Sequence, residues 1–130
     1  MSLELINPKD MPVPEMYSQV VVATGSKLVF ISGQQPEDRN GKLVGHGDFA
    51  AQARLSFANL GRALRAAGAR PDQVCKITIY IVDYDRDEHV PIIEEAQVSL
   101  FGDHKPANVI VGVAIMSPGY LIEVDAIAVI

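Results

Sequence analysis

The sequence predicts an α+β fold in which two helices cover one face of a mixed β-sheet. Two stretches, residues 49–67 and about 88–101, repeat apolar residues at helical spacing, and five other stretches alternate or are rich in β-branched residues. In chain order these elements read β-β-α-β-α-β-β. Because each helix has an apolar face to bury, both are expected to pack on the sheet. The 130 residues fit one domain, residues 1–130.

The first elements are a proline-rich arm and a predicted hairpin. Residues 1–16 contain three prolines and no clear period, so we expect an extended arm. Residues 17–24 and 28–33 are rich in β-branched and aromatic residues, and Gly25-Ser26-Lys27 lies between them. This pattern predicts a β-hairpin.

The clearest helix covers residues 49–67. Its apolar residues recur at spacings of four and three, which makes one stripe. Asp48 can cap the start of this helix, and Gly68 can end it. The stripe consists of Phe49, Ala53, Phe57, Leu60, Leu64 and Ala67.

Residues 74–82 alternate strongly and predict a strand. Cys75 shares one predicted face with Ile77, Ile79 and Ile81, so we expect it to be a small core residue.

The second helix is predicted at about 88–101, with Gly102 as its end. Pro91 is tolerated only if it lies in the first turn. Residues 108–116 and 120–130 predict the last two strands.

Composition and charge exclude several classes of function. Hydrophobic residues make up 48% and charged residues 21%, which is typical of globular proteins. No apolar run approaches the roughly 20 residues of a membrane span, and the N-terminus lacks the features of a signal peptide. The net charge of −5 disfavours nucleic acid as the main partner. The single cysteine fits a reducing compartment, so we expect a cytoplasmic protein.

Two helices cannot cover both faces of the predicted sheet, and much of the second face is apolar. We therefore expect an oligomer that buries this face, most simply by closing several sheets around a shared axis.

Short segments with a recognisable order and spacing run along the chain. They are Tyr17-Ser18-Gln19, Leu28-Val29-Phe30-Ile31-Ser32-Gly33-Gln34, Ala51-Gln52-Ala53-Arg54, Asn59-Leu60, Ala66-Ala67-Gly68, Lys105-Pro106-Ala107-Asn108-Val109-Ile110-Val111-Gly112-Val113 and Ile122-Glu123-Val124-Asp125-Ala126-Ile127-Ala128-Val129. From Met16 to Ile130 the chain thereby resembles the reactive intermediate deaminase family, also called the YjgF or Rid family.

The resemblance implies a homotrimer around a central β-barrel, with a small-molecule cleft at each subunit interface. Active members hydrolyse reactive enamines and imines such as 2-aminoacrylate, with no metal and no organic cofactor. Glu123 matches the glutamate that positions or activates water. Tyr17, Ser32 and Gly33 match residues that line the family's cleft.

Two positions depart from the family pattern. Asn108 stands where the resemblance implies an arginine that clamps the substrate carboxylate, and Ile110 stands where some members have a cysteine. An arginine can pair both carboxylate oxygens, whereas asparagine carries no charge. We therefore expect a neutral ligand, or one held by another cation. Arg39, Arg86 and Lys105 are available, and Lys105 is nearest to Asn108 in sequence.

Each candidate residue also has a structural interpretation. Glu123 can act as a general base, or its carboxylate can be satisfied by backbone N–H groups or a neighbouring subunit. Tyr17 and Ser32 can be ordinary strand polar groups. His46, His89 and His104 show no metal-ligand spacing.

Two functions stay open. The first is a diverged hydrolase that deaminates an imine, enamine or related reactive metabolite, with Glu123 orienting water and Asn108 contacting the ligand. The second is a non-catalytic trimeric protein that binds a small molecule. Related proteins have been labelled endoribonucleases, but the acidic charge and the lack of an RNA-binding motif give that function little support here.

Overall fold

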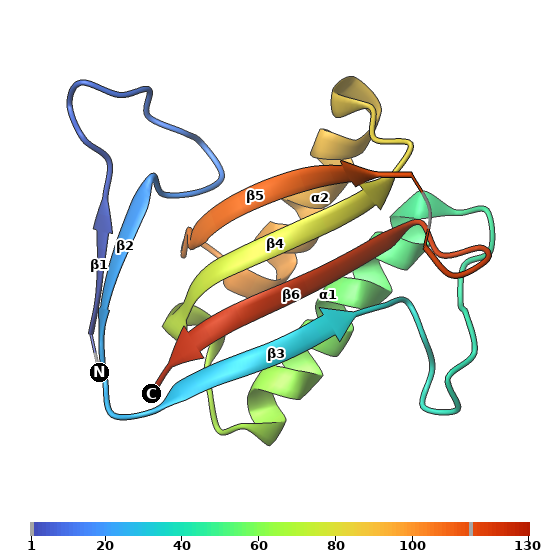
Figure 1. Cartoon of the computed structure of the whole chain (residues 1–130), viewed down its shortest axis with the longest axis horizontal. Coiled ribbons are helices and arrows are strands. Elements are labelled where there is room, and N and C mark those ends of the chain that lie inside the picture. Colours follow the sequence, from blue (N-terminus) through green and yellow to red (C-terminus); the bar gives the residue numbers. More distant parts are fainter. Residues whose placement is uncertain (1, 115) are drawn as a thin grey trace.

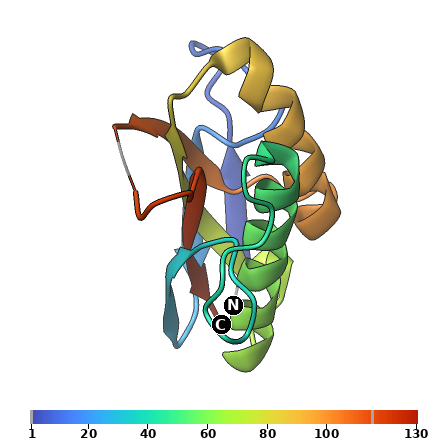
Figure 2. The same cartoon turned by 90° about the vertical axis from the view of Figure 1, so that its right-hand side faces the viewer.

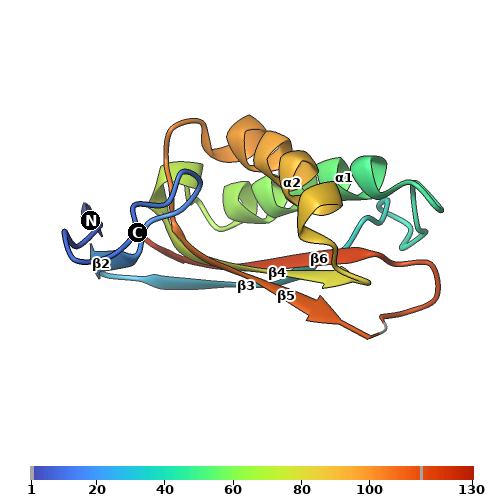
Figure 3. The same cartoon turned by 90° about the horizontal axis from the view of Figure 1, so that it is seen from above.

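A computed structural model of the chain describes residues 2–114 and 116–130 and has two layers, a β-sheet and a pair of helices. Figures 1 and 3 show both helices on the same face of a four-stranded sheet with the strand order β3-β6-β4-β5. The predicted α+β architecture is confirmed. The sheet strands are β3 (Leu28–Gln34), β4 (Val74–Val82), β5 (Ala107–Val113) and β6 (Ile122–Val129).

The sheet is mixed. Strand β6 runs antiparallel to both of its neighbours, β3 and β4, whereas β4 and β5 are parallel. A parallel pair needs a crossover connection, and helix α2 (Arg86–Phe101) supplies it. Strand β5 is last in the strand order and so forms an edge of the sheet, and α2 lies beside it.

Helix α1 (Phe49–Ala66) begins and ends where the sequence predicts. The Asp48 side chain accepts a hydrogen bond of 3.0 Å from the backbone N–H of Ala51. Gly68, just beyond the end of the helix, has a φ of 75°, a conformation that glycine adopts without steric cost.

Helix α2 begins two residues before its predicted start. The Asp85 side chain accepts from the backbone N–H of Glu88 and so caps the helix at Arg86. Pro91 is consequently the sixth residue of the helix, and the prediction that it lies in the first turn is wrong. Because proline has no N–H, the carbonyl of Asp87 loses its usual partner in the helix.

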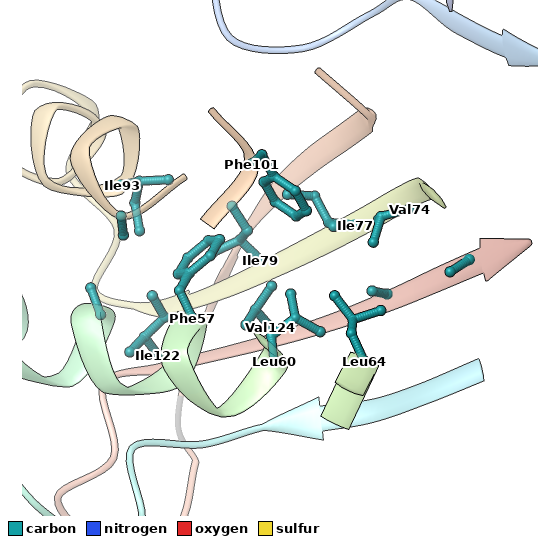
Figure 4. Packing of buried hydrophobic residues seen from close by; sticks show 14 of the residues in the cluster. Phe57, Leu60, Leu64, Val74, Ile77, Ile79, Ile93, Phe101, Ile122 and Val124 are labelled. Carbon is teal, nitrogen blue, oxygen red and sulfur yellow. The ribbon is translucent and has the colours of Figure 1, made fainter. Parts of the chain in front are cut away.

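The core lies between the sheet and the two helices, where Figure 4 shows Phe57, Leu60 and Leu64 of α1 against the sheet. Isoleucines 77, 79 and 81 of β4 are fully buried there. Cys75 is only half-buried, so the prediction that it is a core residue is wrong. A β-bulge between Val74 and Lys76 shifts the alternation by one residue and turns Val74 into the core instead.

The predicted hairpin between residues 17–24 and 28–33 does not form. Strand β2 (Val20–Thr24) pairs with β1 (Ser2–Ile6), which lies in the predicted extended arm, and β3 pairs with β6. Figure 1 shows β1 and β2 as a separate two-stranded sheet beside the ends of the main strands. The segment between β2 and β3 does not form a hairpin turn. Lys27 in this segment donates a backbone hydrogen bond to Ile130 and accepts one from it.

The face of the sheet away from the helices is open in this chain, as the side view in Figure 2 and the top view in Figure 3 show. It carries exposed apolar side chains, including Leu28 (65% exposed) and Phe30 (70% exposed). Val109 and Val111 of β5 add to this surface. No helix within the described part of the chain is long and apolar enough to cross a membrane.

The last two strands are slightly shorter in the structure than the sequence predicts. Strand β5 ends at Val113 rather than 116, and β6 begins at Ile122 rather than 120. Residue 115, which falls within the predicted strand 108–116, lies outside the described residues.

Candidate functional site

A cleft of about 520 Å³ lies at the β5 edge of the sheet. Its walls come from the segment before β2, from α2 and from β5. Three of the six predicted site residues, Tyr17, Asn108 and Ile110, line this cleft.

Two hydrogen bonds hold Tyr17 at the cleft through its neighbour Ser18. The Ser18 hydroxyl donates to the carbonyl of Lys105 over 2.6 Å, and the Ser18 backbone N–H donates to the carbonyl of Pro106 over 3.3 Å. Ser18 is 3% exposed. These bonds fasten the N-terminal segment to the residues just before β5, so that Tyr17 and Asn108 share one cleft.

A chain of polar contacts runs from Asn108 to the backbone of Met16. The Asn108 amide nitrogen Nδ2 donates to Gln97 Oε1 over 3.5 Å, and Gln97 Nε2 donates to the Met16 carbonyl over 3.4 Å. Gln97 is 4% exposed and projects from α2. The Asn108 oxygen Oδ1 is buried and has no hydrogen-bond partner within residues 2–114 and 116–130.

Glu123 lies on the open face of the sheet. Its strand neighbours Ile122 and Val124 point into the core, and the alternation of β6 turns Glu123 the opposite way. The Glu123 side chain packs directly over Gly33, where a Cβ atom would overlap the carboxylate. Ser32, beside Gly33, is exposed.

The Glu123 carboxylate has no hydrogen-bond or ion-pair partner among the residues described. The only ion pair in that part of the chain joins Arg70 and Asp72. No backbone N–H group within residues 2–114 and 116–130 donates to Glu123, so the described residues give no support to one of its two structural interpretations.

The six predicted residues therefore fall into two groups on opposite faces of the sheet. Asn108 pairs with Ile77, whose side chain is in the core, so Asn108 points to the helix side. Glu123 pairs with Tyr80 on the other side.

Asn108, Ile110 and Tyr17 line the cleft, whereas Glu123, Gly33 and Ser32 lie at the open face. Within one chain, these two groups cannot contact the same small ligand.

Of the three positively charged residues considered from the sequence, the one nearest to Asn108 along the chain is not the one that lines its cleft. Arg86, at the start of α2, lines the cleft with Asn108. Lys105 lines a neighbouring hollow of about 220 Å³ that shares Gln97 with the cleft. Arg39 lines a third hollow, near the start of the loop that precedes α1.

Sequence reasoning missed Gln97 and Glu94, which also line the cleft. A signal for Gln97 is present in the sequence, because it stands four residues after Ile93 on the apolar stripe of α2. A long polar residue on a buried stripe indicates a specific partner. Glu94 gives no such signal, since a glutamate on a helix is common at any solvated position.

Two histidines are held by structural contacts. His104 Nε2 lies 2.7 Å from the Val74 carbonyl, and His89 Nδ1 accepts from the backbone N–H of Asp85 over 2.9 Å. In the described part of the chain, no group of three or more His, Cys, Asp or Glu residues is placed to hold a metal ion.

Tyr80 and Asp125 form a polar pair on the open face. The Tyr80 hydroxyl donates to Asp125 Oδ2 over 3.3 Å. Burial raises the pKa of the Tyr80 phenol above its ordinary value of 10.0, and the negative charge of Asp125 raises it further. Burial likewise raises the pKa of the Cys75 thiol above 9.0, which does not favour a reactive thiolate.

The comparisons with known proteins agree with this fold. Residues 9–130 match the family described as endoribonuclease L-PSP. The chain belongs to this family, which includes the Rid proteins. A RutC family protein of Pyrococcus horikoshii is 35% identical over 127 residues, with 96% of each chain covered. The 3-aminoacrylate deaminase RutC of Acinetobacter baylyi is 30% identical, with 98% of each chain covered.

A crystal structure of a Rid family member has the same arrangement. It is YyfB of Yersinia pestis, described as a protein of unknown function, with a TM-score of 0.92, 32% identity and full coverage of both chains. The predicted membership of the Rid family is therefore confirmed.

Proposed function

We propose that this Rid family member deaminates a small imine or enamine by hydrolysis, in clefts that form between copies of the chain. The observation that carries this proposal is the half-buried Glu123 carboxylate, which packs over Gly33 without a partner among the described residues, on an apolar face that a second copy can cover. The name of the Acinetobacter relative, 3-aminoacrylate deaminase, supports the same class of reaction.

In this proposal Glu123 acts as the general base. It takes a proton from a water molecule as the water oxygen bonds to the imine carbon, and the imine nitrogen takes up a proton from solvent, which gives a carbinolamine. The protonated Glu123 then passes its proton to the nitrogen, the hydroxyl group releases its proton to solvent as the C–N bond breaks, and ammonia leaves a carbonyl compound behind. An enamine first takes a proton at carbon to become the imine. No electron acceptor or donor is needed.

The composite cleft would join the two groups of residues described above. Tyr17, Asn108 and Ile110 would come from one copy, and Ser32, Gly33 and Glu123 from another. The open face supports an oligomer, because exposed apolar patches of this kind mark interaction surfaces. We propose the homotrimer around a central barrel that the family resemblance implies, with Phe30 near the contact.

The decisive experiment measures the release of ammonia and carbonyl product from imines generated in situ. Glu123→Gln keeps the size of the side chain and removes the base, so the rate should fall by roughly 10²–10⁴-fold. Asp125→Asn is the matched control, because Asp125 lies on the same strand and face. An equal loss in both variants, or none in Glu123→Gln, would rule out the role of Glu123.

The oligomer has its own test. Phe30→Glu places a charge on the open face, where the side chain is 70% exposed in a single chain. We expect sedimentation to change from an oligomer to a monomer while the far-UV circular dichroism stays the same. A wild-type protein that sediments as a monomer would contradict the composite cleft.

A second candidate function is binding without turnover, favoured by Asn108 in place of arginine and by Ile110 in place of cysteine. It predicts that the protein binds a small molecule in the same cleft, and that Glu123→Gln leaves this binding intact.

A further inference from the structure

Two strands of the chain each have one edge that no described residue covers. Within residues 2–114 and 116–130, β3 pairs only with β6 in the main sheet, and β2 pairs only with β1 in the small sheet. Figure 1 shows the β1–β2 ribbon, in blue, running away from β3. An uncovered edge leaves N–H and C=O groups that can pair with another strand, and a two-stranded ribbon is marginally stable by itself.

The C-terminus of the chain fastens the link between β2 and β3. The backbone N–H groups of Ser26 and Lys27 both donate to the carbonyl of Ile130, over 2.9 and 3.1 Å, and the Ile130 N–H donates to the Lys27 carbonyl over 3.0 Å. Gly25 lies so close to Val129 that a Cβ atom on Gly25 would overlap the Val129 side chain. The chain therefore leaves the main sheet at this link, and β2 does not fold back onto β3 of its own chain.

The residues of β2 nevertheless match the uncovered edge of β3. Antiparallel pairing in the register of the predicted hairpin sets Val22 against Phe30, whose side chains are 47% and 70% exposed in the single chain. On the helix side the same register sets Val21 against Ile31, which packs at the margin of the core. Apolar residues thus meet on both faces, as a specific register requires. The five pairs are Val20–Ser32, Val21–Ile31, Val22–Phe30, Ala23–Val29 and Thr24–Leu28.

Solved structures of the family differ in how closely they match this chain. YyfB and a putative endoribonuclease of Thermotoga maritima are both 32% identical to it and are covered almost completely, yet their TM-scores are 0.92 and 0.70. The family therefore contains more than one arrangement of nearly the same chain. A ribbon that leaves its own sheet and joins another would produce such a difference.

We propose that the β1–β2 ribbon of one copy pairs, through β2, with the uncovered β3 edge of a second copy. The oligomer is then held together by exchanged strands, whereas the proposed function requires only that copies touch. Exchange of an identical element between copies is a low-cost route to an oligomer, because each pairing is one that the sequence already encodes.

The exchange accounts for the division of the candidate site between the two faces. Tyr17 shares its cleft with Asn108 of the same chain, because Ser18 is hydrogen-bonded to the residues just before β5. In the exchanged register, Ser32 and Gly33 of the second copy lie beside the start of β2. Tyr17 stands three residues before that start, about 10 Å along an extended chain. Pairing of β2 with the second copy therefore brings the two groups of site residues toward each other.

The test determines whether Val22 lies next to Phe30 of its own chain or of another chain. Val22→Cys/Phe30→Cys is made in a Cys75→Ser background, so that the engineered cysteines are the only two in the chain. After oxidation, a non-reducing denaturing gel should show bands at two and three times the mass of one chain, and reductant should remove them. A disulfide found only at the mass of one chain, or two free thiols, would overturn the proposal.

Two further cysteine pairs serve as controls. Leu5→Cys/Val21→Cys joins directly opposed residues of the ribbon and should form a disulfide at the mass of one chain. Val22→Cys/Val29→Cys moves one cysteine to the core side of β3, and both thiols should stay free. If the Val29 variant forms disulfides between copies as readily as the Phe30 variant, the copies collide without this register and the proposal is wrong.

A measurement on the unmodified sequence excludes an artefact of the substitutions. Chains labelled with ¹³C and unlabelled chains are unfolded together and refolded, and isotope-filtered NOE spectra are recorded. Cross-peaks between the Val22 methyl groups and the Phe30 ring should join labelled to unlabelled chains. Their presence only within labelled chains would overturn the exchange.

Failure of this inference is distinguishable from failure of the proposed function, since neither measurement needs turnover. Disulfides between copies of a protein that hydrolyses no imine would keep the exchange and remove the enzyme. An active oligomer in which β2 meets β3 only within one chain would keep the enzyme and remove the exchange. Bands at twice the mass alone would keep the exchange and contradict the homotrimer.

Discussion

The two faces of the sheet differ in what completes them. On the helix side, α1 and α2 bury the apolar residues of β4 and β6, so that Ile79 and Val124 are fully inaccessible. On the other side nothing within the described chain covers Phe30, yet the sequence places a large aromatic residue there. The first face accounts for the fold of one chain, whereas the second has the composition of a surface that needs a partner.

The candidate site residues are divided between the same two faces. In the proposed function, the helix side contributes the cleft that Asn108 lines, and the open side contributes the Glu123 carboxylate, which has no partner among the described residues. Under the proposed function, such a site would tie catalysis to assembly, because Glu123 of one copy and Asn108 of another would meet only when two copies do. The comparison therefore predicts that substitutions on the two faces will have different consequences.

The largest effect on stability is expected on the helix side. Ile79 is 0% exposed at the centre of the core, so Ile79→Ala should lower the free energy of unfolding by about 2–5 kcal/mol. The loss includes the transfer free energy of the missing methyl groups and the cavity that they leave. Urea denaturation at several protein concentrations would measure it, and the loss should be present at each of them.

Phe30→Ala is the matched substitution on the open face. Because Phe30 is 70% exposed in one chain, its truncation should reduce stability only at protein concentrations where the oligomer is populated. A loss that is the same at every concentration would mean that Phe30 stabilises the single chain, and the distinction between the two faces would fail.

The fold was predictable where periodicity alone decides it. The stripe of α1 and the alternation of β6 specify both the element and the buried face, and Asp48 and Gly68 mark the helix ends. The pairing of β2 was not predictable, because an alternating pattern predicts a strand but does not identify its partner. The bulge at Cys75 is a similar case, since one extra residue in a strand leaves no mark in the sequence.

The packing of Glu123 over Gly33 gives the third prediction. Gly33 is not in the left-handed region, so Gly33→Ala adds no backbone strain, but its Cβ would overlap the Glu123 carboxylate. The glutamate must then move, and deaminase activity should fall about 10- to 100-fold while the free energy of unfolding changes by less than about 1 kcal/mol.

The double variant Gly33→Ala/Glu123→Gln checks that the effect runs through Glu123. Its activity should equal that of Glu123→Gln alone, since a displaced base and an absent base are equivalent. A further loss in the double variant would assign Gly33 a separate role in binding the ligand.

The candidate site was only partly predictable, for a related reason. Asn108 and Glu123 could be recognised from the segments around them, but their placement on opposite faces depends on the register between β4, β5 and β6. Register is set by packing across strands and not by any one segment. The role of Gln97 depends in turn on α2 lying beside the β5 edge, which brings three segments that are distant in sequence into one polar chain.

The smallest effect is expected from the polar pair on the open face, Tyr80 and Asp125. Burial and the charge of Asp125 raise the pKa of Tyr80 in the folded state above the value of 10.0 that applies to the unfolded chain. The folded state therefore holds the phenolic proton more tightly. The contribution of this raised pKa to the free energy of unfolding is fully present below the unfolded pKa, and it is lost as the pH rises through the folded pKa.

Tyr80→Phe removes that ionisation, so the variant should lose less stability than wild type between about pH 9 and pH 11. Urea midpoints across this range would measure the difference. Some alkaline loss should remain, because burial and the nearby Glu37 also raise the pKa of Tyr120. Asp125→Asn, which keeps the phenol and removes the charge, should lie between wild type and Tyr80→Phe. If wild type and Tyr80→Phe lose stability in parallel, then the Tyr80–Asp125 pair does not form in solution, and the open face lacks the one polar contact that the structure assigns to Asp125.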